Sequence, residues 1–441
     1  MHCCPAQAYS AAFSIDLKIK CQIICSYLYS IFYYCFILLA SVHSKMTSLR
    51  VVRSFVRVFH THSAKLPCRP SHTSSPSHSS THEISSKECF LSTHPPLTSP
   101  SLAPFPRSDF SPFLHFPKTC SIIGAPLASG QPLVGVDLGP AVLRAGGLIE
   151  RLESDDWRVH DYGDIWFNHD KEPTRSVNHK SSTNSNEHSE NNGYSHLLHS
   201  STVAAANAHI AAATEAAAKK HEFVLTLGGD HSIGIGSMSG LLAARPDMGI
   251  LWVDAHADIN TPRLSLSGNI HGMVVSFLMN LENCRNEIRG FEWMNELPEL
   301  TPSRIVYVAL RDIDLAEKNI LKQLGIRCYT MYEIDRYGMS KVMEMSFDSL
   351  IGRRQLPLHL SFDIDSVDPL FAPSTGTRVA GGLSYREAYY ICESVAETNL
   401  LSSMDLVEVN PSLGSGVEGA SEKTVNMAVG LISSAMGNKI L

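Results

Sequence analysis

The sequence has no excess of positive charge, no cysteine framework and no internal repeat. Its 441 residues include 36 lysines and arginines against 43 aspartates and glutamates, which gives a net charge of −7 at pH 7. Seven of its 11 cysteines lie before residue 100, and no CxxC pair occurs. These absences argue against a basic nucleic-acid-binding surface and against a disulfide framework, so we expect a reducing compartment for the folded part.

Acidic residues are absent from Met46 to His82, a segment that opens with "MTSLRVVRSFVRVFHTHSAK". On a helix its apolar side chains share one face and its arginines another, which is typical of a mitochondrial transit peptide. Residues 22–42 are uncharged and long enough to span a bilayer, so a membrane anchor is an alternative. A cytoplasmic protein whose N-terminus targets nothing is another alternative. We interpret residues 1–117 as a leader and a Ser/Thr/His/Pro-rich linker that does not fold alone, and we prefer a mitochondrial location.

From residue 118 onward, short apolar runs alternate with helical patterns. The predicted strands are 121–125, 223–227, 249–253, 305–310, 358–362 and 406–409, and the predicted helices are 139–152, 202–220, 315–324, 340–351, 384–398 and 420–435. Strands that alternate with helices favour a parallel sheet covered on both faces. We therefore expect one α/β domain over residues 118–441, interrupted by a polar, low-complexity insert at about 168–195.

Acids and histidines follow the predicted strands directly. In "VDAHADIN" (253–260), the side chains of Asp254, His256 and Asp258 point the same way if the segment is extended. Asp363 and Asp365 repeat this spacing after the strand at 358–362, and His231 follows a Gly-Gly turn after the strand at 223–227. Ligands of open parallel sheets bind at the carboxyl ends of the strands, so these groups are expected to meet there.

Four carboxylates and two imidazoles at one apolar edge would repel or stay unsatisfied without a cation. One DxH segment alone is more often a solvated turn, but three such clusters after apolar strands disfavour that interpretation. The set exceeds the needs of one octahedral ion and suits two ions about 3.5–4 Å apart. Oxygen-rich ligands with some imidazole and no thiolate favour Mn²⁺ over structural Zn²⁺.

The motifs "GGDHS", "DAHADIN", "SGNIHG", "SFDIDSVDP" and "EVNPSLG" occur in an order and spacing that resemble the ureohydrolases and, among them, the arginases. The resemblance runs from about Ser121 to near the C-terminus. It implies a three-layer α/β/α fold of the arginase/deacetylase type with an eight-stranded parallel sheet, two Mn²⁺ per subunit and a homotrimer. The implied reaction, part of arginine metabolism, is hydrolysis of L-arginine to L-ornithine and urea.

The resemblance also implies roles for individual residues. It places one Mn²⁺ among His231, Asp254, Asp258 and Asp365, and the other among His256, Asp254, Asp258 and Asp363. It makes His271 a proton shuttle. It places Asn260 and Ser267 at the substrate α-carboxylate, Asp314 and Glu317 near the α-amino group, and Thr377 and Glu408 near the guanidinium end.

Elementary chemistry is consistent with these roles. The guanidinium carbon is a poor electrophile, and a metal pair that bridges a water can supply hydroxide at neutral pH. Asp258 can accept a hydrogen bond from that hydroxide and pass a proton to the leaving amine. Glu408 can pair with the guanidinium. Simpler interpretations are ordinary loop hydroxyls for Ser267 and Thr377 and a helix-start acid for Glu317.

The sequence departs from the arginase pattern at two positions, with Met273 where glutamine and Arg378 where proline is expected. Its C-terminal tail is also shorter than the tail that many arginases use in trimer contacts. No metal ligand is missing. An agmatine-cleaving relative and a non-catalytic arginine-binding protein remain the alternatives to an arginase.

Overall fold

The computed structural model describes residues 111–115, 118–165, 194, 196–414 and 419–439, all within one compact unit, Thr98–Leu441. The transit-like segment, the apolar segment 22–42 and nearly all of the linker and of the insert lie outside the described residues. Among the residues that are described, no helix combines the length and the apolar character that crossing a membrane requires.

A single eight-stranded sheet forms the centre of this unit, with the strand order β2-β1-β3-β8-β7-β4-β5-β6. Every strand pair in it is parallel. The strands are β1 (Thr119–Ala125), β2 (Arg158–Asp164), β3 (Phe223–Gly228), β4 (Gly249–Val253), β5 (Ile305–Leu310), β6 (Arg327–Thr330), β7 (Leu358–Asp363) and β8 (Leu401–Val407). The last strand of the chain, β8, therefore lies in the middle of the sheet.

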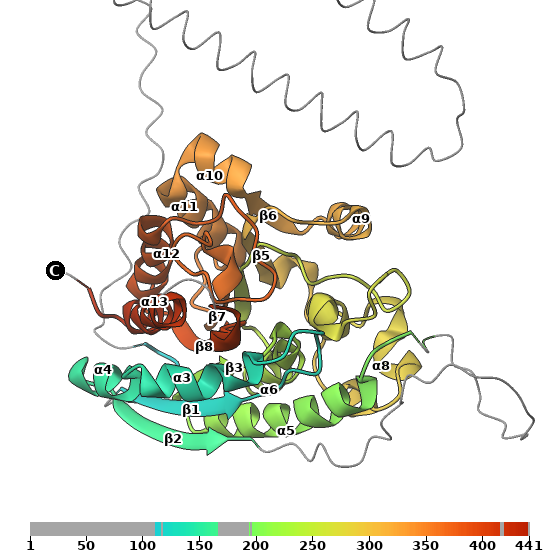
Figure 1. Cartoon of the computed structure of the whole chain (residues 1–441), viewed down its shortest axis with the longest axis horizontal. Helices are drawn as coiled ribbons and strands as arrows, with labels where there is room; N and C mark the ends of the chain where they lie inside the picture. Colours follow the sequence, from blue (N-terminus) through green and yellow to red (C-terminus); the bar gives the residue numbers. More distant parts are fainter. Residues whose placement is uncertain (1–110, 116–117, 166–193, 195, 415–418, 440–441) are drawn as a thin grey trace, which may run out of the picture. The chain divides into compact units, whose positions relative to one another are not determined.

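Helices cover both faces of the sheet, which gives three layers (Figure 1). One face carries α3 (Gly139–Ala145), α4 (Leu148–Ser154), α10 (Met331–Tyr337), α11 (Met339–Leu350), α12 (Tyr385–Glu397) and α13 (Ala420–Ala435). The other carries α5 (Ser200–Lys219), α6 (Gly234–Ala244), α7 (Val274–Leu278), α8 (Cys284–Glu287) and α9 (Leu315–Leu324). Each face has its own buried hydrophobic core.

Short 3-10 helices follow several strands or join the longer helices. They are η1 (Val136–Leu138), η2 (His231–Ile233), η3 (Ile270–Met273), η4 (Leu281–Asn283), η5 (Glu292–Glu296), η6 (Pro302–Arg304), η7 (Ile364–Ser366) and η8 (Pro411–Gly414). Two of them, η2 and η7, follow β3 and β7 and carry residues of the predicted metal site.

The predicted three-layer fold with a parallel sheet is confirmed, and the differences have local causes. The two strands that the sequence did not predict, β2 and β6, are the edge strands, and their solvent-facing side chains break the apolar pattern. Strand β8 begins at Leu401 rather than near residue 406, because serines and an aspartate interrupt its apolar run. The predicted helix 139–152 is two helices, since Gly147 takes a left-handed conformation between them (φ 84°).

Candidate metal centre

Four neighbouring strands bring the predicted metal ligands and the predicted substrate-binding residue Glu408 to one edge of the sheet. His231 lies three residues beyond the end of β3, Asp254 directly follows β4, Asp363 is the last residue of β7, and Glu408 directly follows β8. These strands are consecutive in the sheet (β3-β8-β7-β4) and parallel, so their carboxyl ends lie side by side. The sheet therefore brings together residues that are far apart in the sequence.

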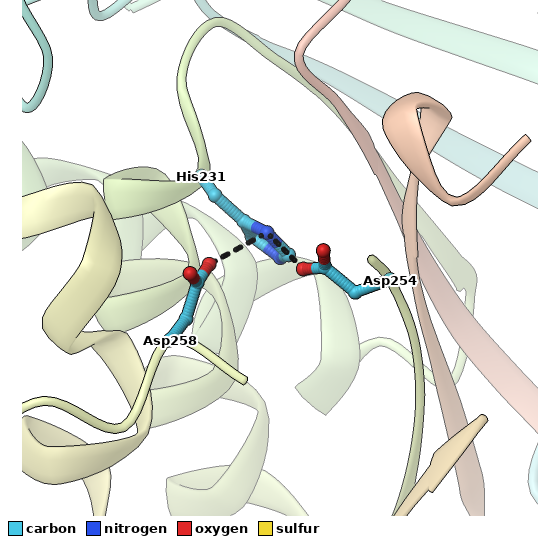
Figure 2. Close-up of side chains that lie close together, drawn as sticks. All are labelled: His231, Asp254 and Asp258. Atoms are coloured by element: carbon cyan, nitrogen blue, oxygen red, sulfur yellow. Dashed lines mark ion pairs between the residues drawn. The ribbon is translucent and has the colours of Figure 1, made fainter. Parts of the chain in front are cut away.

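The first group of donors surrounds the imidazole of His231. Its Nδ1 lies 3.2 Å from Asp254 Oδ2, 3.1 Å from Asp258 Oδ2 and 3.1 Å from Asp363 Oδ2. Figure 2 shows the ring between the carboxylates of Asp254 and Asp258. The ring stacks on Trp252 with 4.3 Å between centroids, and its Nε2 lies 2.9 Å from Ser361 Oγ. Packing and a hydrogen bond thus fix the orientation of this histidine.

The second group surrounds His256. Its Nδ1 lies 3.4 Å from Asp254 Oδ1 and 3.1 Å from Asp365 Oδ2. Asp254 therefore directs one oxygen to each histidine. The site therefore contains two overlapping sets of donors that are close enough to hold a metal ion. One set is His231, Asp254 and Asp258, and the other is Asp254, His256 and Asp365.

The distances differ from the expected sharing of ligands. Asp363 lies with His231 and Asp365 lies with His256, whereas the resemblance implies the opposite pairing. The cause is a turn: the backbone N–H of Asp365 donates to Asp363 Oδ1 over 2.8 Å, and Asp365 sits in η7 rather than in the extended strand. The two side chains consequently point to different histidines.

The electrostatics of this cluster favour the binding of a cation. Burial and the neighbouring carboxylates Asp365 and Asp254 raise the pKa of Asp363 well above its usual range. Burial and Asp254 likewise raise the pKa of both Asp258 and Asp365. Burial alone would lower the pKa of His256, but Asp365 and Asp254 raise it to about 12. These side chains repel one another as ions unless a cation balances them.

A metal ion fits this donor set for a further reason. Among the described residues, Nδ1 of His231 is buried and has no hydrogen-bond partner, although three carboxylate oxygens lie within 3.2 Å of it. Burial lowers the pKa of His231, but Asp254, Asp258 and Asp363 raise it well above its usual range, so these atoms attract positive charge, which a metal cation among them supplies. The residues that could hold metal ions are His231, Asp254, His256, Asp258, Asp363 and Asp365.

A cavity of about 160 Å³ opens beside these ligands. Its lining comprises His256, Asp258, Asn260, His271, Gly272, Glu317, Asp363, Asp365 and Thr377. The cavity thus brings Asn260, His271, Glu317 and Thr377, all predicted to act on the substrate, next to the ligands. Thr377 donates its hydroxyl to Asp365 Oδ2 over 2.7 Å, so it also orients a ligand.

Glu408 lies behind His271 rather than on the cavity wall. Its Oε1 is 3.5 Å from His271 Nδ1 and accepts the backbone N–H of His231 over 2.9 Å. Burial lowers the pKa of His271, but Glu408, Asp258 and Asp230 together raise it to about 9. Gln131, for which no role was predicted, donates its Nε2 hydrogen to Glu408 Oε2 over 3.0 Å. The "GQP" segment at 130–132 was the one available signal.

The residues predicted for the α-amino end of the substrate form a connected pair of loops. Asn260 Nδ2 donates to Asp314 Oδ2 over 2.8 Å. Asp314 and Glu317 form a capping box at the start of α9, and Glu317 Oε1 also accepts the backbone N–H of Ile259. Glu317 is therefore both a helix-start acid and part of the cavity wall. Ser267 is exposed, and the structure does not place it on that wall.

Two residues of the site hold their backbone in the left-handed region, Asp258 with φ 48° and Glu408 with φ 64°. Residues other than glycine adopt this region at a cost, and such strain concentrates at functional sites. Glu408 directly follows β8, and Asp258 lies five residues after the end of β4, so both strained residues lie in the loops that form the site.

The two departures from the arginase pattern fall in different environments. Met273 is fully buried in the core beneath α5 to α9, so it does not face the cavity. Arg378 follows Thr377 and donates to the carbonyl oxygens of Thr375 and Leu413 over 3.2 and 2.8 Å. It therefore joins the Thr377 loop to η8.

Comparison with known proteins agrees with this geometry. The sequence profile of the arginase family matches residues 118–437. Arginase-1 of Rattus norvegicus is 44% identical over 324 residues, which covers 73% of this chain and 94% of that protein. "Arginase-2, mitochondrial" of Mus musculus is 43% identical over 345 residues, 76% of this chain and 91% of that protein. The arginase structure from Bacillus caldovelox has a TM-score of 0.62 at 38% identity, covering 74% of this chain and all of that one. A shared fold, motif set and family profile together show that this chain belongs to the arginase family of hydrolases.

Proposed function

We propose that this protein hydrolyses L-arginine to L-ornithine and urea with a pair of Mn²⁺ ions per subunit. The observation that carries the proposal is the pair of donor groups that share Asp254 and contribute His256, Asp258 and Asp365 to the wall of one cavity. The arginase relatives named above support the substrate. Agmatine, which lacks the α-carboxylate, is the competing substrate.

The donor set suits manganese because it offers four carboxylates and two imidazoles and no thiolate. His231, Asp254, Asp258 and Asp363 would hold one ion, and His256, Asp254 and Asp365 the other. When bound, the metal pair would lower the pKa of water toward neutrality and so supply hydroxide as the nucleophile.

Asp258 would move the proton. It lines the cavity, and one of its oxygens is occupied beside His231 Nδ1. Its other oxygen can accept a proton from the nucleophile and return it to the leaving nitrogen of the guanidino group. The left-handed backbone at this residue holds the carboxylate at the cavity wall.

Glu408 would bind the guanidinium. Its carboxylate is held by Gln131 and by the backbone of His231, and it now binds the imidazole of His271. An imidazolium and a guanidinium are both planar cations with N–H donors, so a substrate can take the place of His271 at this carboxylate. The released His271, which lines the cavity, then exchanges protons with solvent.

The other end of the substrate would meet the loops after β4 and β5. Asn260 and Glu317 line the cavity, and Asp314 accepts hydrogen bonds from the Asn260 amide and from the backbone N–H of Glu317. They offer both an amide donor and acceptors, which suits an α-carboxylate beside an α-amino group. Ser267, although exposed here, belongs to the same loop as Asn260.

The test is urea release from L-arginine and from agmatine by the full chain loaded with Mn²⁺, with His256→Ala as the control. Release from arginine that His256→Ala loses supports the proposal. Release mainly from agmatine would mean that the substrate loops have another specificity. Manganese binding without urea release from either substrate would favour an arginine-binding protein instead.

Location and assembly are further proposals. The acid-free, arginine-rich segment from Met46 and the similarity to "Arginase-2, mitochondrial" support a mitochondrial protein with a leader and linker at 1–117. A homotrimer is the expected assembly. Import into isolated mitochondria with cleavage of the leader, and light scattering of the purified protein, test the two proposals separately.

A further inference from the structure

A patch of buried polar side chains crosses the middle of the sheet near the metal centre. Its members are Thr226 on β3, His359 and Ser361 on β7, and Ser403 and Asp405 on β8. All are fully buried. They lie on the face that α6 covers, since the alternate residues of the same strands, such as Leu360 and Met404, belong to the opposite core.

Asp405 is the charged member of this patch. It accepts a hydrogen bond from Ser237 of α6, and the same oxygen lies 3.5 Å from His359 Nε2. Its other oxygen, Oδ1, has no hydrogen-bond partner within the described part of the chain. A buried carboxylate is costly unless its oxygens accept hydrogen bonds, so Oδ1 requires a donor.

The sheet register offers two candidate donors. Thr226 and Ser361 are the residues directly opposite Asp405 on the two neighbouring strands, and both carry a hydroxyl on the same face. Neighbouring strands are about 4.8 Å apart, so both hydroxyls belong to the immediate neighbours of the carboxylate. Ser361 Oγ is also 2.9 Å from Nε2 of the metal-site residue His231. Ser361 therefore contacts His231 and lies opposite Asp405 in the sheet.

We propose that Asp405 is a positioning residue for His231 and acts through Ser361; this inference rests on the proposed function, because it concerns the same metal site. A carboxylate can only accept hydrogen bonds, so Ser361 donates its hydrogen to Asp405. The Ser361 oxygen then accepts the hydrogen on Nε2 of a neutral His231. Nδ1 consequently carries the lone pair and faces the carboxylates of the site.

The unsatisfied atoms agree with this direction of hydrogen bonding. Among the described residues, neither end of the proposed series has a hydrogen-bond partner: Nδ1 of His231, which faces three carboxylate oxygens, and Oδ1 of Asp405. Ser237 and His359 lie against only one oxygen of Asp405, so burial still has a cost at Oδ1. Fixing the tautomer of a metal ligand is a role that would offset this cost.

Manganese binding to the metal-free full chain, measured by titration calorimetry, tests the proposal. Asp405→Asn can donate to Ser361 and so permits the reversed hydrogen-bond direction. We expect it to weaken one class of Mn²⁺ site by about 10–100-fold and to leave KM for arginine within about twofold, because the substrate loops are untouched. Thr226→Val, which removes the hydroxyl on the other side of Asp405, is the matched control and should keep wild-type affinity.

The outcomes separate this inference from the proposed function. A wild-type chain that binds no manganese contradicts the proposed function itself. A wild-type chain that binds manganese, with unchanged affinity in Asp405→Asn, overturns only the role of Asp405. Ser361→Ala interrupts the same series of hydrogen bonds. We expect an equal loss of Mn²⁺ affinity, and no further loss in the double variant. Unchanged affinity in Ser361→Ala overturns the proposal even where Asp405→Asn does not fold.

Discussion

Gly229 sets how closely the turn after β3 approaches the loop after β1, and its replacement by alanine tests the geometry of the site. A Cβ at this position would lie 1.9 Å from the carbonyl oxygen of Leu127 and 2.8 Å from its nitrogen. Ordinary contacts of a Cβ begin near 3.4 Å, so one of the two backbones must move by about 1.5 Å. Backbone atoms cannot rotate away as a flexible side chain can.

The magnitude follows from what this turn carries. Gly229 N donates to Ala125 O and Asp230 N to Leu127 O, both over 2.8 Å. Losing both bonds costs about 1 kcal/mol each, and overpacking costs about 1–3 kcal/mol more. Gly229 O also accepts the N–H of Glu408. Since His231 is two residues away, we expect kcat/KM to fall by about 100-fold, the usual effect of a misplacement near 1 Å.

The assay compares melting temperature, Mn²⁺ affinity and urea release in Gly229→Ala and in a control, Gly272→Ala. The melting temperature of Gly229→Ala should fall by roughly 5–15 °C, from about 2–4 °C per kcal/mol. A Cβ at Gly272 meets no atom within 4 Å, so that variant should melt within about 2 °C of the wild type. Wild-type stability and metal binding in Gly229→Ala would refute the reasoning.

Three further predictions concern the metal, a buried acid and Gln131. Chelation should lower the melting temperature, and Mn²⁺ at a hundredfold excess over Kd should restore about 2.7 kcal/mol per site; a melting temperature indifferent to chelation would contradict the metal centre. Burial and Asp258 raise the pKa of Glu317 to about 7, so its stabilising contribution is complete below about pH 4.5 and is lost as the pH rises through 7. The metal-free wild type should therefore lose roughly 3 kcal/mol more between pH 4.5 and 8 than Glu317→Gln, and parallel stability curves would contradict this. Gln131→Met removes a hydrogen bond to the Glu408 carboxylate and should reduce kcat/KM by about 10–100-fold with manganese affinity unchanged; a parallel loss of affinity would show a wider disturbance.

The sequence predicts the fold well where strands are buried on both faces. Strands such as β3 and β4 read as continuous apolar runs, and their ends show where the ligands lie. The edge strand β2 has mostly exposed side chains, so no apolar run marks it. β8 was placed too late because Ser402, Ser403 and Asp405 resemble a loop. A polar strand in the centre of a sheet is visible only when its partners are known.

The members of the site follow from the sequence, but their pairing does not. The i, i+2 spacing predicts that Asp254, His256 and Asp258 meet; in the structure Asp254 belongs to both donor groups, with Asp258 in one and His256 in the other. The same spacing gives no hint that a turn sends Asp363 to one histidine and Asp365 to the other. Contacts across elements, such as Gln131 with Glu408, span too much of the chain for any local pattern to record.

The central place of β8 has a consequence for the order in which the protein is made. Seven strands are synthesised before β8, the strand that lies between β3 and β7, leaves the ribosome. Until then the two halves of the metal centre have no common sheet, although every metal ligand has already been translated. Proteins fold from the N-terminus during synthesis at about 5–20 residues per second, so a growing chain of this protein carries its ligands apart for several seconds. The meeting of His231 with its carboxylate partners is therefore completed only when β8 is in place, and in a chain that stops before Leu401 the strand before His231 would share no sheet with β4 and β7.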